Sequence, residues 1–159
     1  MNIKTKIVIG INIFFLGLVL FITQFVSFPI VSGHSMEPTL KSGEILLLDK
    51  TAEFIQRYDI VVAKSSYKLL IKRVIGLPGE TISFKNGVIY VNGEPTDYSF
   101  ANDEYILDGG ILKDGELKLD LDEYFIVGDN RNHSSDSREI GPVKVDAIQG
   151  VIKKVILDK

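Results

Sequence analysis

The sequence predicts a mostly β protein that begins with a single transmembrane helix. Three observations predict this fold class: an uncharged apolar run within residues 7–28, a series of short apolar segments bounded by charges and turn residues, and an Asn-Gly pair flanked by β-branched and aromatic residues. The chain has 159 residues, which is enough for one domain with its own hydrophobic core beside the helix.

The apolar run near the N-terminus is long enough to cross a membrane, since about 20 helical residues span the ~30 Å hydrocarbon core of a bilayer. A cleaved signal peptide would have a shorter apolar region followed by a small-x-small cleavage site. A buried core helix would carry polar residues at helical spacing. No such site follows the run, and only Asn12 interrupts it up to residue 22. We therefore expect an uncleaved membrane anchor over residues 7–27.

Two positive charges, Lys4 and Lys6, precede the anchor. Positively charged flanks of a transmembrane segment tend to stay in the cytoplasm. We therefore expect a single-pass protein of the cell membrane, with residues 1–6 in the cytoplasm and residues 28–159 forming one extracytoplasmic domain.

The rest of the chain alternates between short strands and turns. The clearest signal is a hairpin over residues 81–95, because Asn86 and Gly87 tolerate the positive φ of a tight type I′ turn. Residues 96–122 are acidic and weakly patterned, and we expect them to form a surface excursion that faces solvent. Further strands are expected at residues 44–48, 59–63, 123–127 and 150–157.

The composition excludes several classes of function. The net charge is −3 and there is no basic run, so we expect no nucleic-acid partner, whose phosphates would call for clustered lysine and arginine. The chain has no cysteine and two histidines. Disulfides, thiolate catalysis and metal sites rich in Cys or His are therefore excluded.

Ser35 lies among small, turn-forming residues and is the first candidate nucleophile. A serine hydroxyl needs an adjacent base to become reactive. His34 is its neighbour, but adjacent side chains in an extended segment point to opposite faces. His133 lies in a loop with no local feature that favours an approach to Ser35. The sequence therefore does not indicate a Ser-His-Asp triad.

Residues 67–80 predict a strand that places one cation on each face. At a period of two, Lys72 lies between Leu70 and Val74 on one face, and Arg73 lies on the other. A buried arginine has to find a carboxylate, whereas burial can lower the pKa of a lysine by several units. A base active near pH 7 needs a fall of roughly 3 units, or ~4 kcal/mol. Taken alone, this segment favours the simpler interpretation that Lys72 snorkels to solvent.

Residues 125–142 concentrate Asp, Asn, Ser and Arg between a strand and a Gly-Pro turn. A solvated polar loop would have the same composition.

Together these segments resemble the type I signal peptidases, the membrane-anchored serine proteases that remove signal peptides from exported proteins, and most of all the short enzymes of Gram-positive bacteria. The resemblance extends from the anchor to about Val151. Its motifs follow in the family's order: Gly-x-Ser-Met-x-Pro-Thr at 33–39, Arg-x-Asp-Ile-Val at 57–61, Lys-Arg-Val-Ile-Gly-x-Pro-Gly at 72–79 and Gly-Asp-Asn-Arg-x-x-Ser-x-Asp-Ser-Arg at 128–138. The resemblance implies a β-sheet catalytic domain in the form of a partial barrel.

The resemblance implies a Ser-Lys dyad, in which Ser35 is the nucleophile and Lys72 its general base. His34 then has no part in the chemistry. Ser134 would hydrogen-bond Lys72 and hold its amine toward Ser35. The remaining implied roles are two ion pairs that support the site, Asp129 with Arg73 and Asp136 with Arg138.

The chain departs from the family pattern at two positions. Some relatives have a serine that assists the oxyanion two residues before the nucleophile, where this chain has Gly33. The backbone N–H of Ser35 remains the first oxyanion donor, and the second is open between a backbone group and Ser32. The other departure is Tyr58, where many members have glycine, and we expect it to leave catalysis unaffected.

The resemblance also implies the partners, which are secretory preproteins with small residues one and three positions before the cut, together with membrane lipid. The signal peptide would bind by strand addition, with shallow apolar pockets selecting small side chains. No cofactor or metal is expected, because a lysine base and backbone donors suffice for acyl transfer. The candidate pocket residues are Val31, Met36, Leu40, Leu70 and Ile71, each of which could instead be ordinary core.

Three alternatives remain. The self-cleaving domain of SOS repressors also uses a Ser-Lys pair, but it follows a DNA-binding domain and not a membrane anchor. A catalytically dead, membrane-tethered module that binds exported or pilin-like proteins would be favoured by loss of Ser35 or Lys72, and both are present. An enzyme dedicated to a few substrates, such as pilus subunits, has the same sequence features as a general one.

Overall fold

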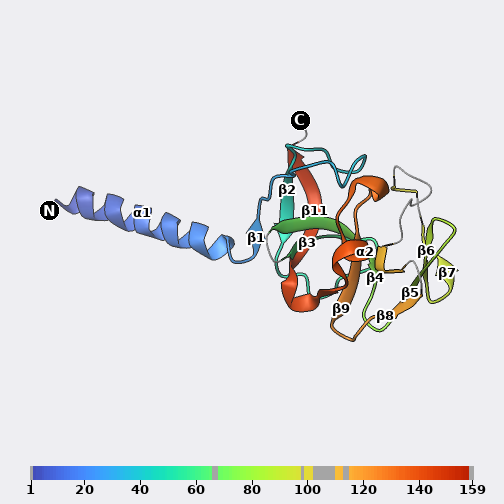
Figure 1. The fold of residues 1–159 in the computed structure, drawn as a ribbon. Helices are drawn as coiled ribbons and strands as arrows, with labels where there is room; N and C mark the ends of the chain where they lie inside the picture. Colours follow the sequence, from blue (N-terminus) through green and yellow to red (C-terminus); the bar gives the residue numbers. More distant parts are fainter. Residues whose placement is uncertain (1, 66–67, 98, 102–109, 113–114, 158–159) are drawn as a thin grey trace.

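The computed structural model describes residues 2–65, 68–97, 99–101, 110–112 and 115–157. Helix α1 (Ile3–Ile22) projects from one side of a β domain that holds the rest of the described chain (Figure 1). None of its residues is buried, and it is the one helix of the described residues that is long and apolar enough to cross a membrane. The expected apolar helix is therefore confirmed.

The helix ends earlier than the sequence indicated. Thr23 is its C-cap, and Val26 and Ser27, which we expected in the anchor, form strand β1 (Val26–Ser27). The cause is local pairing: β1 is antiparallel to the strand that ends at Asp49, and Lys50 N–H donates to the carbonyl oxygen of Phe25 at 2.8 Å.

The larger sheet has seven strands in the order β1-β2-β11-β3-β4-β9-β10. All neighbours are antiparallel. The strands expected at residues 44–48, 59–63, 123–127 and 150–157 all occur, with ends shifted by at most two residues, and the strand expected within residues 67–80 is the shorter β4. The bounds are β2 (Ile45–Asp49), β3 (Ile60–Lys64), β4 (Leu69–Gly76), β9 (Glu123–Val127), β10 (Val143–Lys144) and β11 (Ile148–Leu157).

The smaller sheet has four strands in the order β7-β6-β5-β8. Its centre is the predicted hairpin of β5 (Thr81–Lys85) and β6 (Val88–Val91). Asn86 and Gly87 have φ of 51° and 83°, as the two-residue turn requires. The outer strands are β7 (Glu94–Pro95) and β8 (Glu116–Lys118).

Four short helical segments complete the described chain. They are η1 (Gly110–Leu112), η2 (Arg131–His133), α2 (Ser137–Ile140) and η3 (Val145–Ala147). The β domain is the mostly β arrangement that the sequence predicted.

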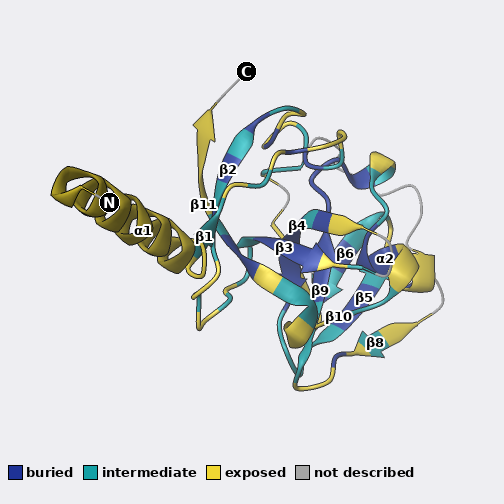
Figure 2. Ribbon diagram, turned by 90° about the vertical axis from the view of Figure 1, so that its left-hand side faces the viewer, coloured by how far each residue is buried: buried dark blue, intermediate teal, exposed yellow. Residues whose placement is uncertain are grey.

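The hydrophobic core has three parts, and Figure 2 shows the buried residues concentrated in the interior strands, with α1 exposed along its length. One cluster joins the two sheets and includes Ile75, Ile82 and Phe125. A second lies within the large sheet and includes Val61, Val74 and Ile126. The third, formed by Val31, Met36, Leu40 and Leu46, packs under the segment that carries Ser35.

The expectation of a surface excursion over residues 96–122 is wrong at three described positions, although most of the other described residues of this stretch are exposed. Thr96, Leu112 and Leu119 are buried, and β8 pairs with β5. Leu112 and Leu119 belong to the core between the sheets, so two isolated leucines in an acidic stretch supply core contacts that no periodic pattern signals. Residues 98, 102–109 and 113–114 lie outside the described residues.

Strand β4 positions the site because its two edges are paired differently. Along one edge β3 pairs with the strand from Leu69 to Arg73. Along the other edge β9 pairs only with its second part, from Arg73 to Gly76. The edge of residues 69–72 that faces away from β3 is thus open.

The close packing at Gly76 gives a test of the core. A Cβ added there would lie 2.6 Å from Ile82 Cδ1 and 2.9 Å from Phe125 Cβ. We expect Gly76→Ala to lower the free energy of unfolding by about 1–3 kcal/mol, because overpacking displaces neighbours. Denaturant unfolding followed by circular dichroism measures this. Gly115→Ala is the matched control, since nothing lies within 4 Å of its added Cβ; equal stabilities of the two variants would contradict the packing argument.

Candidate active site

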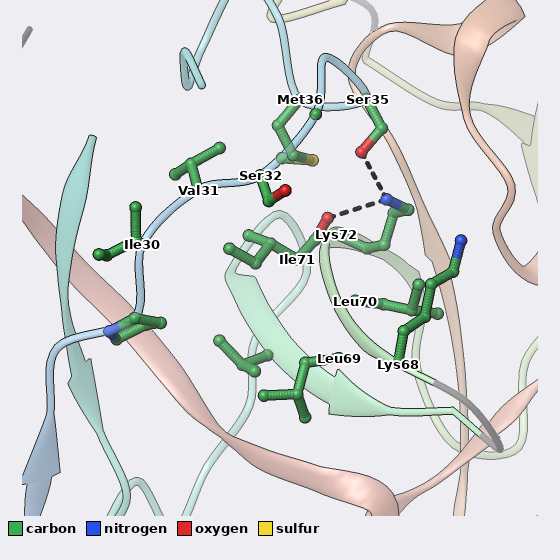
Figure 3. A pocket seen from close by; sticks show the side chains of 13 residues that line it. Ile30, Val31, Ser32, Ser35, Met36, Lys68, Leu69, Leu70, Ile71 and Lys72 are labelled. Atoms are coloured by element: carbon green, nitrogen blue, oxygen red, sulfur yellow. Dashed lines mark hydrogen bonds between the residues drawn. The ribbon is translucent and has the colours of Figure 1, made fainter. Parts of the chain in front are cut away.

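Ser35 and Lys72 meet at the open edge of β4. Lys72 Nζ lies 2.6 Å from Ser35 Oγ and donates to the carbonyl oxygen of Ile71 at 3.1 Å (Figure 3). Ser35 belongs to a turn whose neighbours Val31, Met36 and Leu40 are anchored in the core. Ser35 is thus fixed by apolar packing on both sides along the chain, and Lys72 by its strand.

The Lys72 side chain is buried and does not snorkel. The residue is 3% exposed and lies between buried Leu70 and Val74 on its face of the strand. Burial lowers the pKa of Lys72 to about 8, against the ordinary 10.5. The Asp136 carboxylate raises this pKa and the Lys68 ammonium lowers it further. A neutral amine is therefore accessible close to neutral pH, which is what a general base requires.

Arg73, on the opposite face of β4, has the carboxylate that its burial demands. Arg73 Nε donates to Asp129 Oδ1 at 2.8 Å and Nη2 to Oδ2 at 2.6 Å. The Asp129 side chain is fully buried. Thr39 Oγ1 donates to Asp129 Oδ2 at 2.6 Å, and the guanidinium stacks over the Phe100 ring at 4.2 Å. The pair joins β4 to the loop after β9 and to the turn that carries Ser35.

The second expected ion pair lies inside that loop. Arg138 Nε donates to Asp136 Oδ1 and its Nη2 to Oδ2, both at 2.8 Å. Asp136 Oδ2 also accepts the backbone N–H of Gly128 at 3.0 Å, and Arg138 Nη2 donates to the carbonyl oxygen of Arg131 at 2.6 Å. One carboxylate therefore fixes the two ends of the loop.

Ser134 lies beside the site, but the expected hydrogen bond to Lys72 is absent. Ser134 Oγ is buried and has no hydrogen-bond partner among the described residues. It packs against Gly128, where an added Cβ would lie 2.3 Å from Ser134 Oγ and 2.4 Å from the Ser35 carbonyl oxygen. The hydroxyl is thus close to the Ser35 backbone, while the lysine contacts are to Ser35 Oγ and Ile71 O.

The turn before Ser35 leaves a backbone donor for an oxyanion. Gly33 has a φ of 91°, a conformation that glycine adopts without strain. The backbone N–H of Ser35 has no hydrogen-bond acceptor within the described residues. Ser32 lines the cleft beside it, so its hydroxyl stays a candidate for the second donor.

The two histidines lie in surroundings different from those of the Ser35 hydroxyl. His34 Nδ1 contacts Glu37 Oε1 at 2.8 Å, and its side chain is 70% exposed. His133 is exposed in η2. The Ser35 hydroxyl meets a lysine and neither histidine.

A cleft of about 350 Å³ opens along the β4 edge and ends at the Ser35–Lys72 pair. Four of the expected pocket residues line it, namely Val31, Met36, Leu70 and Ile71. Leu40 does not, because its side chain packs into the core under the turn. The sequence did not single out the remaining lining residues, which include Pro29, Ile30, Val62, Lys68 and Leu69.

The sequence did not indicate several residues that contribute to the site. Thr39 and Asn130 lie within recognised motifs, and their polar side chains were the available signal. Phe100 had none, since it follows a weakly patterned segment and reaches Arg73 through the fold alone. Within the described residues no cluster of three or more His, Asp or Glu side chains could hold a metal ion.

The backbone at Tyr58, a departure from the family pattern, explains why glycine is common there. Tyr58 has a φ of 72°, in the left-handed region that favours glycine. Its carbonyl oxygen accepts from Arg73 Nη1 at 2.8 Å, and its ring lies 5.2 Å from that of Phe100.

Comparisons with known proteins identify the family to which the chain belongs. A family model described as "Signal peptidase, peptidase S26" matches residues 5–157. The chain is 44% identical over 135 residues to "Signal peptidase I V" of Bacillus subtilis (strain 168), covering 77% of this chain and 80% of the relative. It is 38% identical over 136 residues to "Signal peptidase I" of Bacillus caldolyticus, covering 77% and 75%.

A solved structure shares the fold as well. The crystal structure of a signal peptidase I from Enterococcus faecalis V583 matches with a TM-score of 0.52 and 31% identity, covering 64% of this chain and 98% of that chain. The chain therefore belongs to the signal peptidase family S26, as a serine peptidase with an N-terminal apolar helix as its membrane anchor.

Proposed function

We propose that the chain cleaves signal peptides from exported preproteins after small-x-small sites, with Ser35 as nucleophile and Lys72 as general base. The observation that carries this proposal is the 2.6 Å contact between Lys72 Nζ and Ser35 Oγ at the end of an apolar cleft. Burial lowers the pKa of that lysine, so it can accept a proton at ordinary pH.

The open edge of β4 is the site for the substrate backbone. Residues 69–72 pair with β3 on one side and with no strand of the described residues on the other. An extended peptide added there forms main-chain hydrogen bonds that do not depend on its sequence. Such a strand runs along the cleft toward Ser35, so the pockets select the side chains that precede the cut.

The chemistry follows from the positions of the two side chains. Neutral Lys72 takes the Ser35 hydroxyl proton as Oγ adds to the scissile carbonyl carbon, and the Ser35 N–H donates to the oxyanion. The tetrahedral intermediate collapses, the C–N bond breaks, and the leaving amine takes the proton from Lys72. Neutral Lys72 then deprotonates a water molecule that adds to the acyl carbon, the ester C–O bond breaks, and Ser35 Oγ takes the proton back from Lys72.

The lining of the cleft accounts for small side chains before the cut. Val31, Met36 and Leu70 are buried, and Ile71 is partly buried against the same cluster, so these apolar side chains leave shallow depressions that accept alanine at low cost. Larger side chains would have to displace core residues, and close-packed interiors resist this.

The anchor places the site at the outer face of the membrane. We propose that residues 1–6 stay in the cytoplasm, because Lys4 and Lys6 precede α1. The β domain then lies outside, with membrane lipid beside it. Ser35 lies thirteen positions after Ile22, about 45 Å at full extension, so Ser35 works close to the point where a signal peptide leaves the bilayer.

The nucleophile and base can be tested in detergent with a preprotein that carries an Ala-x-Ala site. We expect Ser35→Ala and Lys72→Ala to lower kcat about a thousandfold or more. His34→Ala is the control, and we expect it to stay within about twofold of wild type because its side chain is exposed. Gel analysis of processed product measures all three. Loss of cleavage in His34→Ala, with cleavage retained in Lys72→Ala, would make the proposed base wrong.

The pH dependence follows from the state of Lys72. The amine acts as a base only when neutral, and its pKa is about 8. We expect kcat/KM to rise about tenfold per pH unit below pH 8 and to level off above it. A pH–rate series with a short peptide substrate measures this, with a solvent isotope effect to show that chemistry limits the rate. A profile that is flat between pH 6 and pH 10 under those conditions would contradict a lysine base.

The buried Arg73–Asp129 pair supports the site. The loss of unfolding free energy on its removal can be compared with the loss on removal of a surface ion pair. Asp129→Asn leaves the buried Arg73 without its counter-charge, so we expect a loss of about 3–5 kcal/mol in unfolding free energy. Asp122→Asn removes the exposed pair with Lys144 and is expected to cost less than about 1 kcal/mol. Urea unfolding in detergent measures both, and similar losses would contradict the supporting role of Asp129.

A further inference from the structure

Asn130 holds both carbonyl groups that flank the Ser35 side chain. Its Nδ2 donates to the carbonyl oxygen of His34 at 3.1 Å, and its backbone N–H donates to the carbonyl oxygen of Ser35 at 3.0 Å. Asn130 is 6% exposed. The two peptide planes on either side of the nucleophile are therefore tied to one buried residue of another segment.

The bond to His34 fixes the direction of the Ser35 N–H. The two groups belong to the same peptide unit, which is planar, and in a trans peptide they point in opposite directions. The one cis peptide bond of the described residues is Glu37–Pro38, so the unit between His34 and Ser35 is trans. A rotation of this unit that moved the N–H away from an oxyanion would break the Asn130 bond.

The carbonyl oxygen of His34 accepts a second hydrogen bond. The effect of Asn130 on the orientation of the peptide unit can therefore be distinguished from its effect on folding stability. Glu37 N–H donates to the same oxygen at 3.2 Å, so removal of the Asn130 amide does not leave it unsatisfied. The bond from Glu37, which lies in the same turn, would by itself allow the His34–Ser35 peptide unit to rotate. The added bond from Asn130, which belongs to another segment, restricts this rotation. The loss of the amide is thus expected to affect orientation more than folding.

The side-chain oxygen of Asn130 also indicates a role in positioning and not in stability alone. Its Oδ1 is buried without a hydrogen-bond partner among the described residues, which costs stability. The orientation of the amide is settled by its neighbour, since only Nδ2 can donate to a carbonyl oxygen. A residue kept for stability alone would not bury an unpaired acceptor.

We propose that Asn130 is a positioning residue for the oxyanion hole, which it orders by holding the His34–Ser35 peptide unit with the Ser35 N–H directed at the scissile carbonyl oxygen. This inference rests on the proposed function. It differs from the roles of Lys72 and its ion-paired neighbours, because Asn130 acts on the stabilisation of the oxyanion and not on proton transfer.

The test uses the full chain in detergent, with wild type, Asn130→Ala and Asn130→Ser, neither of which can reach the His34 carbonyl. His133→Ala is the control, as an exposed residue of the neighbouring helical turn. Three quantities are measured: kcat and KM for an Ala-x-Ala peptide, the pH at which kcat/KM levels off, and the Ki of the matching peptide aldehyde. The aldehyde carbon accepts Ser35 Oγ while the hydroxyl proton moves to Lys72, so its carbonyl oxygen becomes the oxyanion.

We expect kcat of the two Asn130 variants to fall about tenfold to a hundredfold, because a small misplacement of a catalytic group has this effect. KM should change less than about twofold, the aldehyde Ki should rise by about tenfold or more, and the midpoint of the pH profile should stay in place, since the base is untouched. The melting temperature should stay near that of His133→Ala.

A kcat within about threefold of wild type in both variants would overturn the inference. So would a fall in kcat with an unchanged aldehyde Ki, a shifted pH midpoint, or a melting temperature that collapses in both variants. Cleavage at the wild-type rate by the Ser35→Ala or Lys72→Ala variant would instead overturn the proposed function. The two failures are therefore distinguishable.

Discussion

The site depends on one constraint, which is the burial of two consecutive cations on opposite faces of β4. Lys72 and Arg73 are 3% and 8% exposed, and an isolated charge in such surroundings is too costly to keep. The two residues meet the constraint differently because their chemistry differs. Arg73 keeps its charge and pairs with Asp129, whereas Lys72 can lose its proton, and its lowered pKa makes this loss easy.

The loop between Gly128 and Arg138 follows from that constraint. It supplies the carboxylate of Asp129, which also accepts from Thr39 in the turn that carries Ser35. A single buried anion thus joins the strand that carries Lys72 to the segment that carries Ser35. The loop can come this close only because position 128 is glycine, where a Cβ would overlap the Ser35 carbonyl oxygen. The same approach allows Asn130 to reach the His34 carbonyl.

Much of this could be predicted from the sequence, because strand periodicity places Lys72 and Arg73 on opposite faces and turn chemistry fixes the hairpin at Asn86. The motifs of the resemblance supplied the partners Asp129 and Asp136. Other features depend on tertiary packing that no local pattern encodes. Leu40 and Val31 have the same apolar character, yet only Val31 lines the cleft. Phe100, which covers Arg73, lies in a stretch without periodicity.

The connection between α1 and Ser35 is a structured part of the site and not a loose tether. After α1 the chain pairs with β2 at Val26 and bridges to it again at Ile30. Pro29 and Ile30 then line the cleft, and Ser35 follows within five residues. Because β2 fixes this path at two points, the position of Ser35 relative to the end of the helix is set by strand pairing. A flexible linker of the same length would let Ser35 drift by many ångströms relative to the end of the helix, so the pairing with β2 is what holds the two at a set separation.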